Sequence, residues 1–219
     1  MTMSDLESAF LDWSVASQAL DEPAERAALR AARRCVASHG TAGWEWLEAA
    51  LKDVQRRWFA AEIMGGLALP PRLFEPLLAA AILERNPSAN RYLVEPCVKA
   101  AGARRVLERL LSYLETGSVV EKAGAASALY WVRIQPGEHT ELVQRIRRQM
   151  LREFIVSGDL EVQRRILPML MLPDILQTPD AEDAREVIRI ARNHADGYIR
   201  HRVEVQLGET STFAPIPSH

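Results

Sequence analysis

Apolar residues recur at intervals of three and four positions over most of this chain. That spacing places them on one face of an α-helix. The first such run consists of Leu6, Phe10, Trp13 and Ala16. Just before it, Ser4 and Glu7 have the spacing of a capping box, which satisfies free N–H groups at a helix start. No segment alternates between apolar and polar residues over a strand's length, so the pattern predicts helices and no β-sheet.

Two further helices are predicted in the first quarter of the chain. Pro23 suits the first turn of a helix, and Gly40 suits its end. The apolar face of this helix would carry Ala27, Leu29, Ala32 and Val36. Thr41 can cap the next segment, whose apolar residues are Trp44, Leu47, Ala50 and Leu51.

A short pattern then recurs five times. Each copy opens with an anchor (Asp, Asn or Ser), places apolar residues seven and eleven positions later, and often places a basic residue four positions later. Position three is apolar as well, except for Arg56 after Asp53 and Glu121 after Ser118. The clearest copy runs from Asp196 to Gly208, and the one from Asn86 is degenerate. The anchors are Asp53, Asn86, Ser118, Asp159 and Asp196, separated by 33, 32, 41 and 37 residues. This spacing is typical of helical-pair repeats.

Positions three, seven and eleven of a copy fall on one side of a helix, because each residue turns it by about 100°. The stripes of the two clearest copies are Ile199, Val203 and Leu207, and Val162, Ile166 and Leu170. Glu121 interrupts the stripe that follows Ser118. An isolated helix pair cannot bury such a stripe, so neighbouring pairs must stack and unfold together in one or two blocks. We therefore predict a single domain over 1–208.

Additional helices are expected before the later anchors, at 72–84, 103–114, 142–154 and 181–194. Pro96 and Pro168 fall inside second helices and should kink or shorten them. The segment 209–219 has no helical pattern and two prolines, so we expect a flexible C-terminal tail that can also dock through its apolar residues.

These motif residues resemble the HEAT-repeat family of armadillo-like proteins, and the resemblance covers roughly 41–208. It implies a right-handed α-α superhelix of about five or six helical pairs, whose second helices line a concave side. It also implies that the anchors form a ladder between repeats with the basic residues four positions on. Those residues are Arg57, Lys122 and Arg200. The anchors Asp53, Ser118, Asp159 and Asp196 each stand where a helix cap is needed, and such structural roles explain anchors and basic residues better than catalysis does.

Composition narrows the function classes only slightly. A net charge of -2 and a pI of about 6.2 give no bulk reason to expect nucleic acid or an anionic membrane as partner. Cys35 and Cys97 each lie in an apolar helical pattern, which favours buried thiols over a disulfide. No signal peptide is visible, and no apolar run approaches the length of about 20 residues that spans a membrane. We expect a cytoplasmic protein.

The candidate binding residues are large side chains of the second helices that point away from the buried stripe. They are Trp58, Arg91, Tyr130, Arg164, Tyr198 and His201. Trp, Tyr and Arg supply most of the binding energy in protein interfaces. This predicts a protein partner, an extended peptide or a helix, on the concave face. The alternative is that Trp58 and Tyr130 pack inward against a neighbouring repeat.

Other chemistries have less support. Arg91, Arg164 and His201 could contact phosphates while Trp58 stacks on a base, but Glu62, Glu95 and Glu161 lie on the same side. No nucleophile elbow, phosphate loop or C-x-x-C motif occurs. His194, Asp196 and His201 surround one loop without the spacing of a metal site, and we expect no metal or cofactor.

The leading prediction is a non-enzymatic protein-interaction module, such as an adaptor, a regulator or an inhibitor or immunity-type scaffold. The alternative is a nucleic-acid-binding protein, since HEAT-like folds include DNA glycosylases that process alkylated bases, although no catalytic motif can be matched. A ligand-binding or lyase-type solenoid would need a deep apolar pocket.

Overall fold

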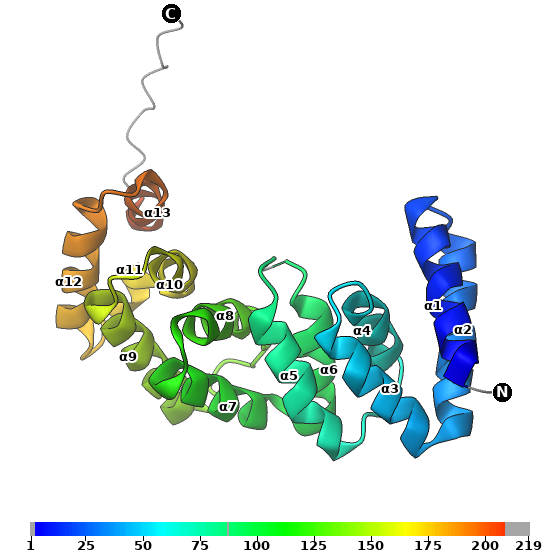
Figure 1. Ribbon diagram of the computed structural model, residues 1–219. Coiled ribbons are helices and arrows are strands. Elements are labelled where there is room, and N and C mark those ends of the chain that lie inside the picture. The colour runs from blue at the N-terminus through cyan, green and yellow to red at the C-terminus, as the bar shows by residue number, and fades with distance from the viewer. Residues whose placement is uncertain (1–2, 87, 209–219) are drawn as a thin grey trace, which may run out of the picture. The chain divides into compact units, whose positions relative to one another are not determined.

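A computed structural model describes residues 3–86 and 88–208 (Figure 1). Within these ranges every regular element is a helix, which confirms the predicted all-α fold without β-sheet. The α-helices are α1 (Met3–Gln18), α2 (Glu22–His39), α3 (Thr41–Lys52), α4 (Arg57–Gly65), α5 (Phe74–Leu83), α6 (Arg91–Ala101), α7 (Ala103–Thr116), α8 (Val119–Leu129), α9 (Thr140–Val156), α10 (Leu160–Ile166), α11 (Leu172–Ile175), α12 (Ala181–Arg192) and α13 (Gly197–Leu207). Two short 3-10 helices are η1 (Pro71–Leu73) and η2 (Leu167–Met169). The predicted tail, 209–219, lies outside the described residues.

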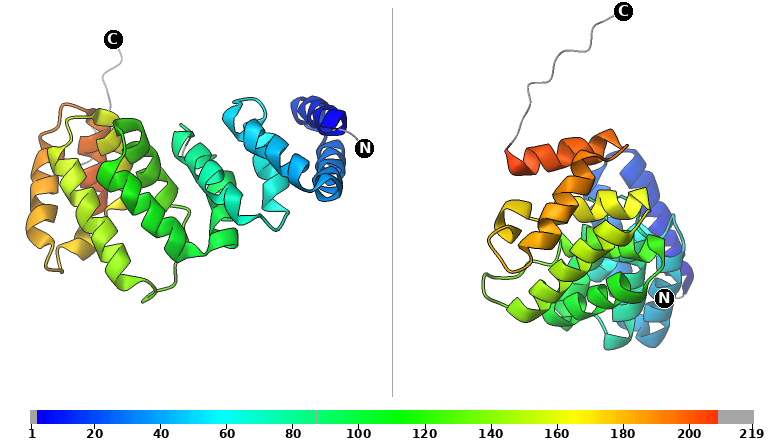
Figure 2. Two further views of the ribbon diagram at one scale, coloured as in Figure 1. Left: turned by 60° about the horizontal axis from the view of Figure 1, so that its bottom comes forward. Right: turned by 90° about the vertical axis from the view of Figure 1, so that its left-hand side faces the viewer.

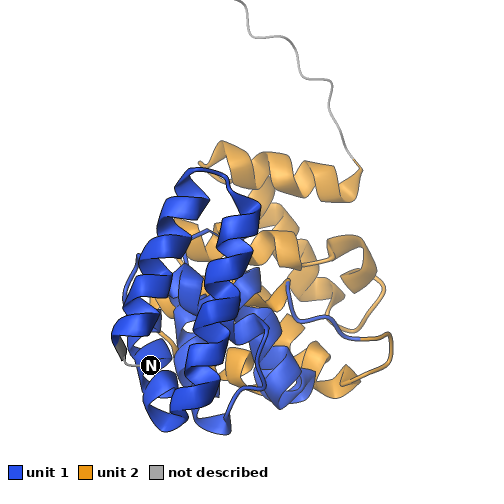
Figure 3. Cartoon of the chain, turned by 90° about the vertical axis from the view of Figure 1, so that its right-hand side faces the viewer, with its two compact units in different colours: residues 1–106, 131–134 blue, residues 107–130, 135–219 orange. Residues whose placement is uncertain are grey.

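The chain divides into two compact units (Figure 3). Unit 1 consists of residues 1–106 and 131–134, and unit 2 of residues 107–130 and 135–219. The boundary falls inside α7. The single domain expected over 1–208 stays a prediction.

Unit 1 begins with two helices, α1 and α2, that lie side by side (Figure 2). Asp21 caps α2 by accepting the N–H of Ala24 at 3.1 Å, and Pro23 lies in the first turn. Gly40 ends the helix with φ of +54°, a backbone conformation that glycine adopts without strain. The predicted start near Pro23 and end at Gly40 are therefore confirmed.

Three details of the predicted helix ends and faces are wrong. α1 begins at Met3, so Ser4 lies inside the helix rather than at its cap, and Glu7 makes other contacts. In α2, Ala27 is exposed and Ala28 is buried, because the face set by Leu29, Ala32 and Val36 includes position 28 instead. Thr41 is the first residue of α3, and Gly40 occupies the cap position before it.

The core of unit 1 contains an aromatic cluster around Phe59 of α4, which is completely buried. Its ring centroid lies 5.7 Å from that of Phe10, 5.4 Å from Trp13 and 6.2 Å from Trp46. Aromatic pairs at these distances stabilise a core by about 0.5–1.5 kcal/mol beyond their buried area. The cluster thus joins α1, α3 and α4.

The two prolines predicted to disturb second helices have different effects. α10 ends at Ile166, and Pro168 lies in the 3-10 turn η2 that follows, so this helix is shortened as predicted. Pro96 lies inside α6, which continues through it to Ala101. Proline removes only one hydrogen bond there, and Pro96 is buried with Cys97 and Val94 against the rest of unit 1.

In unit 2 the predicted anchors cap their helices. Ser118 and Glu121 form a complete capping box at the start of α8. Asp159 accepts the N–H of Val162 at 3.0 Å, and Asp196 accepts the N–H of Ile199 at 3.1 Å. The capping role expected of the anchors is confirmed for these three residues. It is wrong for Asp53 in unit 1, because Arg56 occupies the cap position of α4.

The apolar stripes of the recurrent pattern are buried in both units. In unit 2 the fully buried members are Val162, Ile166, Leu170, Ala125, Ile199 and Val203. In unit 1 they are Ala60, Met64, Leu93 and Cys97. The exceptions are only partly buried: Arg56, Ala89 and Glu121 at position three of their copies, and Leu207 at position eleven of the last copy.

Candidate partner-binding surfaces

The side chain four positions after the anchor ties each second helix to the chain just before it. In three copies it donates a hydrogen bond to the carbonyl oxygen two residues ahead of the anchor. The donor–acceptor pairs are Arg57 with Leu51, Gln163 with Ser157, and Arg200 with His194. Carbonyl groups at a helix end lack partners within the helix, so these bonds satisfy them. This position is therefore structural, whether it holds arginine or glutamine.

Ion pairs also link successive copies, but the basic residues that the family resemblance implied do not pair with the anchors. Arg57 pairs with Glu84 at 3.6 Å in unit 1, and Lys122 pairs with Glu153 at 2.8 Å in unit 2. Both carboxylates lie ahead of the next anchor rather than on it. The anchor Asp196 pairs with Arg164, one position later in its copy than expected. The expected pairing of anchor with position four is thus wrong, although links of this kind exist.

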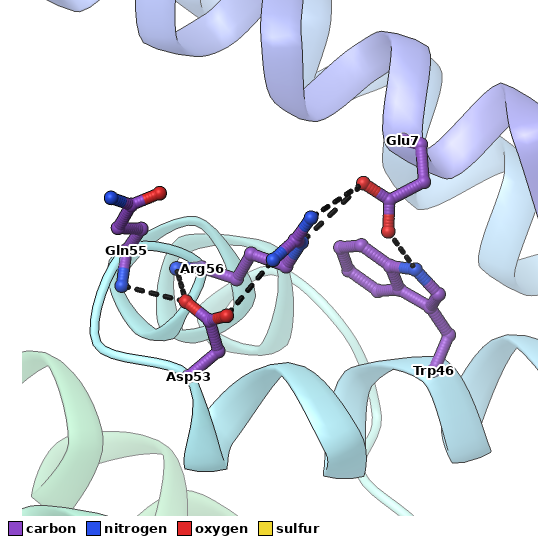
Figure 4. A network of polar contacts seen from close by, with 5 residues as sticks. All are labelled: Glu7, Trp46, Asp53, Gln55 and Arg56. Carbon is purple, nitrogen blue, oxygen red and sulfur yellow. Dashed lines mark hydrogen bonds and ion pairs between the residues drawn. The ribbon is translucent and has the colours of Figure 1, made fainter.

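A polar network connects α1 with the turn between α3 and α4 (Figure 4). The Arg56 guanidinium donates to Glu7 at 3.1 Å and to Asp53 at 2.9 Å, and the Trp46 indole N–H donates to the other oxygen of Glu7 at 3.0 Å. The hydrogen bond to Glu7 raises the pKa of Arg56. Backbone N–H groups of Arg56 and Gln55 lower the pKa of Asp53. These groups satisfy one another, so the network joins helices and is no candidate for chemistry.

The first candidate surface lies on unit 1 and combines aromatic rings with charged groups. Trp58 of α4 meets Tyr92 of α6 edge to face, with 6.4 Å between ring centroids. The Arg91 guanidinium lies 5.7 Å from the ring centre of Trp131 and donates to Glu95 at 2.9 Å. We call this set the unit 1 surface: Trp58, Arg91, Tyr92, Glu95 and Trp131. Amphipathic rings and a guanidinium held in place are typical of interface hot spots.

The second candidate surface lies on unit 2, around a surface pocket of about 370 Å³. We call it the unit 2 surface, and it consists of Glu161, Arg164, Arg165 and Tyr198. Arg164 forms an ion pair with Asp196 at 2.5 Å, and Arg165 donates to Glu161 at 2.6 Å. The Arg164 hydrogen bond lowers the pKa of Asp196, so this carboxylate stays charged at neutral pH. Tyr198 is 47% exposed beside these pairs.

A histidine fixes the loop that positions the unit 2 surface. The backbone N–H of Asp196 donates to Nδ1 of His194 at 2.9 Å, so Nδ1 must carry the lone pair. Nε2 of His194 faces Oε1 of Gln163 at 3.1 Å and is therefore the donor there. Gln163 in turn donates to the carbonyl oxygens of Phe154 and Ser157. This chain of bonds holds Asp196, and through it Arg164, in one geometry.

The six residues predicted from sequence fall into two groups, one on each unit. The structure brings Arg164 and Tyr198 together. Trp58 contacts Tyr92, the residue that follows Arg91 in α6. Tyr130, at the end of α8, is 66% exposed and does not turn inward. Trp58 is partly buried, and His201 is exposed on α13. Their role in binding stays a prediction.

Sequence reasoning missed Tyr92, Trp131 and Arg133 as members or neighbours of the unit 1 surface. Arg133 lies 3.9 Å from Glu95. The copy that begins at Asn86 is degenerate, and α6 starts only at Arg91, so the outward positions could not be assigned correctly. The available signal was composition: Trp and Tyr residues stand next to predicted positions at 92 and 131.

The structure also shows how the metal-ligating side chains and the cysteines of the described residues lie. In these residues no three His, Cys, Asp or Glu side chains are grouped as a metal ion would require. Cys35 and Cys97 are both buried and unpaired with each other, and burial raises the pKa of the Cys97 thiol. No helix among the described residues is both long and apolar enough to cross a membrane.

Fold and surfaces together define an all-helical protein with two aromatic–arginine surfaces. Comparisons of the chain with protein-family models, with curated proteins and with solved structures found no match. The function must therefore be argued from the surfaces themselves.

Proposed function

We propose that this protein is a HEAT-like repeat scaffold that binds another protein and catalyses no reaction. In this proposal about five or six helical pairs form a right-handed α-α superhelix, and the second helices present their outward side chains on its concave face. The observation that carries the proposal is the pair of surfaces at which aromatic rings lie beside held arginines. The unit 1 surface centres on Trp58 and Arg91, and the unit 2 surface on Arg164 and Tyr198.

Preorganisation supports binding at these surfaces. Arg164 is held by Asp196, and Arg91 by Glu95, so little side-chain freedom remains to be lost when a partner binds. Each guanidinium keeps further N–H groups that a partner's carbonyl or carboxylate oxygen can accept. The rings of Trp58 and Tyr198 offer apolar area beside them. This combination suits an extended peptide or a helix with mixed polarity.

Affinity purification from the native cell, followed by quantitative titration of the purified partner, tests the proposal. We expect Trp58→Ala to weaken binding by about tenfold or more, the loss typical of a truncated aromatic hot spot. Tyr198→Ala should have an effect of similar direction while leaving the ion pair between Arg164 and Asp196 intact. Arg164→Glu should weaken binding further, because it places two carboxylates side by side.

Matched controls separate contact from folding. Trp44 of α3 is also partly buried, and Arg34 of α2 is exposed, so Trp44→Ala and Arg34→Glu make equivalent changes away from both surfaces. These variants should bind within about twofold of the wild type, and circular dichroism should be unchanged for all five proteins. If Trp58→Ala, Tyr198→Ala and Arg164→Glu all leave partner binding unchanged, neither surface is the binding site.

Nucleic acid is a weaker candidate, including the base-repair activity considered as an alternative. Arg91, Arg164 and Arg165 each face a carboxylate, which competes with a phosphate for the same guanidinium. A gel-shift titration with single- and double-stranded DNA at two salt concentrations distinguishes the classes. Salt-sensitive binding at micromolar protein would favour nucleic acid, because phosphate contacts impose that dependence.

A further inference from the structure

A second pocket of unit 2, separate from the unit 2 surface, lies along α12. Its volume is about 590 Å³. The residues that line it are Leu176, Arg185, Ile188, Arg189, Arg192, Asn193 and Leu207. Four of them come from α12, and Leu207 is the last residue of α13 (Figure 1).

The pocket combines apolar residues with positive charge. Three apolar side chains of the pocket, Leu176, Ile188 and Leu207, are partly exposed to water. Covering them with apolar groups of a partner would be favourable. Arg185, Arg189 and Arg192 supply three positive charges, and none of the described lining residues is acidic. Of these three, Arg189 pairs with Glu186 at 2.6 Å. Arg185 makes no ion pair within the described residues, so the pocket keeps a net positive charge.

The four α12 residues lie on one face of the helix. Positions 185, 188, 189 and 192 follow the spacing of three, four and seven that brings side chains together along a helix. A neighbouring face of α12, with Ala184, Val187 and Ala191, is buried, and α12 packs against α9 and α13. A further helix could therefore pack along the pocket face of α12.

We propose that this pocket binds a helical segment of a partner protein that carries apolar residues at spacings of three and four, flanked by Asp or Glu. The apolar residues would cover Ile188, Leu176 and Leu207, and the acidic residues would pair with the arginines. A helix is the favoured occupant, because four of the lining residues follow one face of α12 and the pocket is a surface hollow, whereas a small amphiphile needs an enclosing cavity. The inference deepens the proposed function by naming a partner's chemistry, and it rests on residues outside both surfaces described above.

The test uses the full chain and a fluorescein-labelled synthetic peptide of about five helical turns. The peptide carries Leu along one face and Glu on both flanks, with blocked ends. Fluorescence anisotropy should show binding by the wild type that weakens as salt is raised. The double variant Arg185→Glu, Arg192→Glu should bind at least about tenfold more weakly, because attraction becomes repulsion. Ile188→Ala should weaken binding at both salt concentrations.

A matched control places the same charge change elsewhere. Arg30 and Arg34 are exposed on α2 of unit 1, so Arg30→Glu with Arg34→Glu alters the net charge equally. This control should bind the peptide within about twofold of the wild type. If the charge reversal disturbs α12, Arg185→Gln with Arg192→Gln removes the charges with less perturbation and should still weaken binding several-fold.

Four results would overturn the inference. The first is no binding of the peptide by the wild type. The second is equal binding of a scrambled peptide of the same composition, which would show attraction without a helical register. The third is an equal loss in the α2 control. Anionic vesicles that bind in place of the peptide would assign the arginines to a membrane and contradict the inference as well.

Failure here and failure of the proposed function can be told apart. Trp58→Ala and Tyr198→Ala leave the α12 pocket unchanged, so these variants should bind the peptide like the wild type. If they lose the cellular partner but keep the peptide, both proposals stand. If the peptide does not bind while the partner still depends on Trp58, only the α12 inference fails.

Discussion

The two units start their second helices in different ways. In unit 2, Ser118, Asp159 and Asp196 stand directly before α8, α10 and α13 and accept a backbone N–H of the first turn. In unit 1, α4 starts four residues after Asp53, and α6 five residues after Asn86. Asp53 instead accepts the N–H groups of a turn that precedes α4.

Position three explains part of this difference. In unit 2, Val162 and Ile199 are fully buried there, so the helix must begin early enough to turn them into the core. In unit 1 the same position holds Arg56, which reaches Glu7 of α1 instead. The comparison teaches that an anchor stands directly before its helix when position three supports it, either with a buried apolar residue or, after Ser118, with a glutamate that completes a capping box.

The largest expected effect concerns the two most deeply buried phenylalanines. Phe59→Ala in unit 1 and Phe154→Ala in unit 2 should each lower the free energy of unfolding by about 3–5 kcal/mol, since both rings are completely buried. Phe59→Leu should lower the free energy of unfolding more than Phe154→Leu does. Only Phe59 lies in the aromatic cluster with Phe10, Trp13 and Trp46. Urea unfolding followed by circular dichroism measures both differences. Equal costs for the two leucine variants would show that the aromatic geometry adds nothing.

A smaller effect is expected at the buried ion pair of unit 2. Lys122→Met leaves Glu153, which is only 8% exposed, without its cation, and should cost about 3 kcal/mol. Adding Glu153→Leu should restore much of that loss, since a paired charge and a well-packed apolar pair are often similar in free energy. Denaturation midpoints of the single and double variants measure this. A double variant that is less stable than Lys122→Met alone would contradict the prediction.

Removal of a cap tests the comparison itself. Asp159→Ala should lower the free energy of unfolding by about 1 kcal/mol, because the N–H of Val162 loses its acceptor. Asn86→Ala in unit 1 should lower the free energy of unfolding by less than half as much, since the Asn86 side chain accepts the N–H of Ser88 in a turn and does not cap a helix. Asp159→Ser should be nearly neutral. The comparison fails if the two alanine variants are equally destabilised.

The smallest effect is a dependence on pH. Arg164 lowers the folded-state pKa of Asp196 below its value in the unfolded chain, so the folded protein binds this proton less readily. The resulting stability is present above about pH 4 and is lost as the pH falls through the folded-state pKa. Arg164→Met should therefore flatten the fall in stability between about pH 4 and pH 2. Thermal melts across this range measure the slope, and an unchanged slope would mean that the pair has no influence.

Much of the helical pattern could be predicted from the sequence. The expected helices at 103–114, 142–154 and 181–194 correspond to α7, α9 and α12, because long amphipathic runs leave little choice of face. The start of α6 could not be predicted, because position three of the copy that begins at Asn86 holds only a small side chain, Ala89. A similar limit applies to Ala27, which was predicted to be buried in place of Ala28. Neighbouring alanines differ too little to define the buried face of a helix.

The candidate surfaces were predictable only in part. Arg164 and Tyr198 lie on well-defined copies, and their juxtaposition follows from two adjacent anchors at Asp159 and Asp196. Trp131 follows the end of α8, and its contact with Arg91 joins residues 40 positions apart that no local pattern relates. The α12 pocket depends on which side of that helix the fold leaves uncovered, which is a tertiary property.

Hydrogen–deuterium exchange of the protein with and without its purified partner tests the central claim most directly. The account predicts that binding slows exchange in α4, α6, α10 and α13, the second helices that carry the unit 1 and unit 2 surfaces. Trp58→Ala should reduce the protection of α4 and α6 at equal partner concentration. Protection that is absent from all four of these helices when the partner is bound would contradict the account.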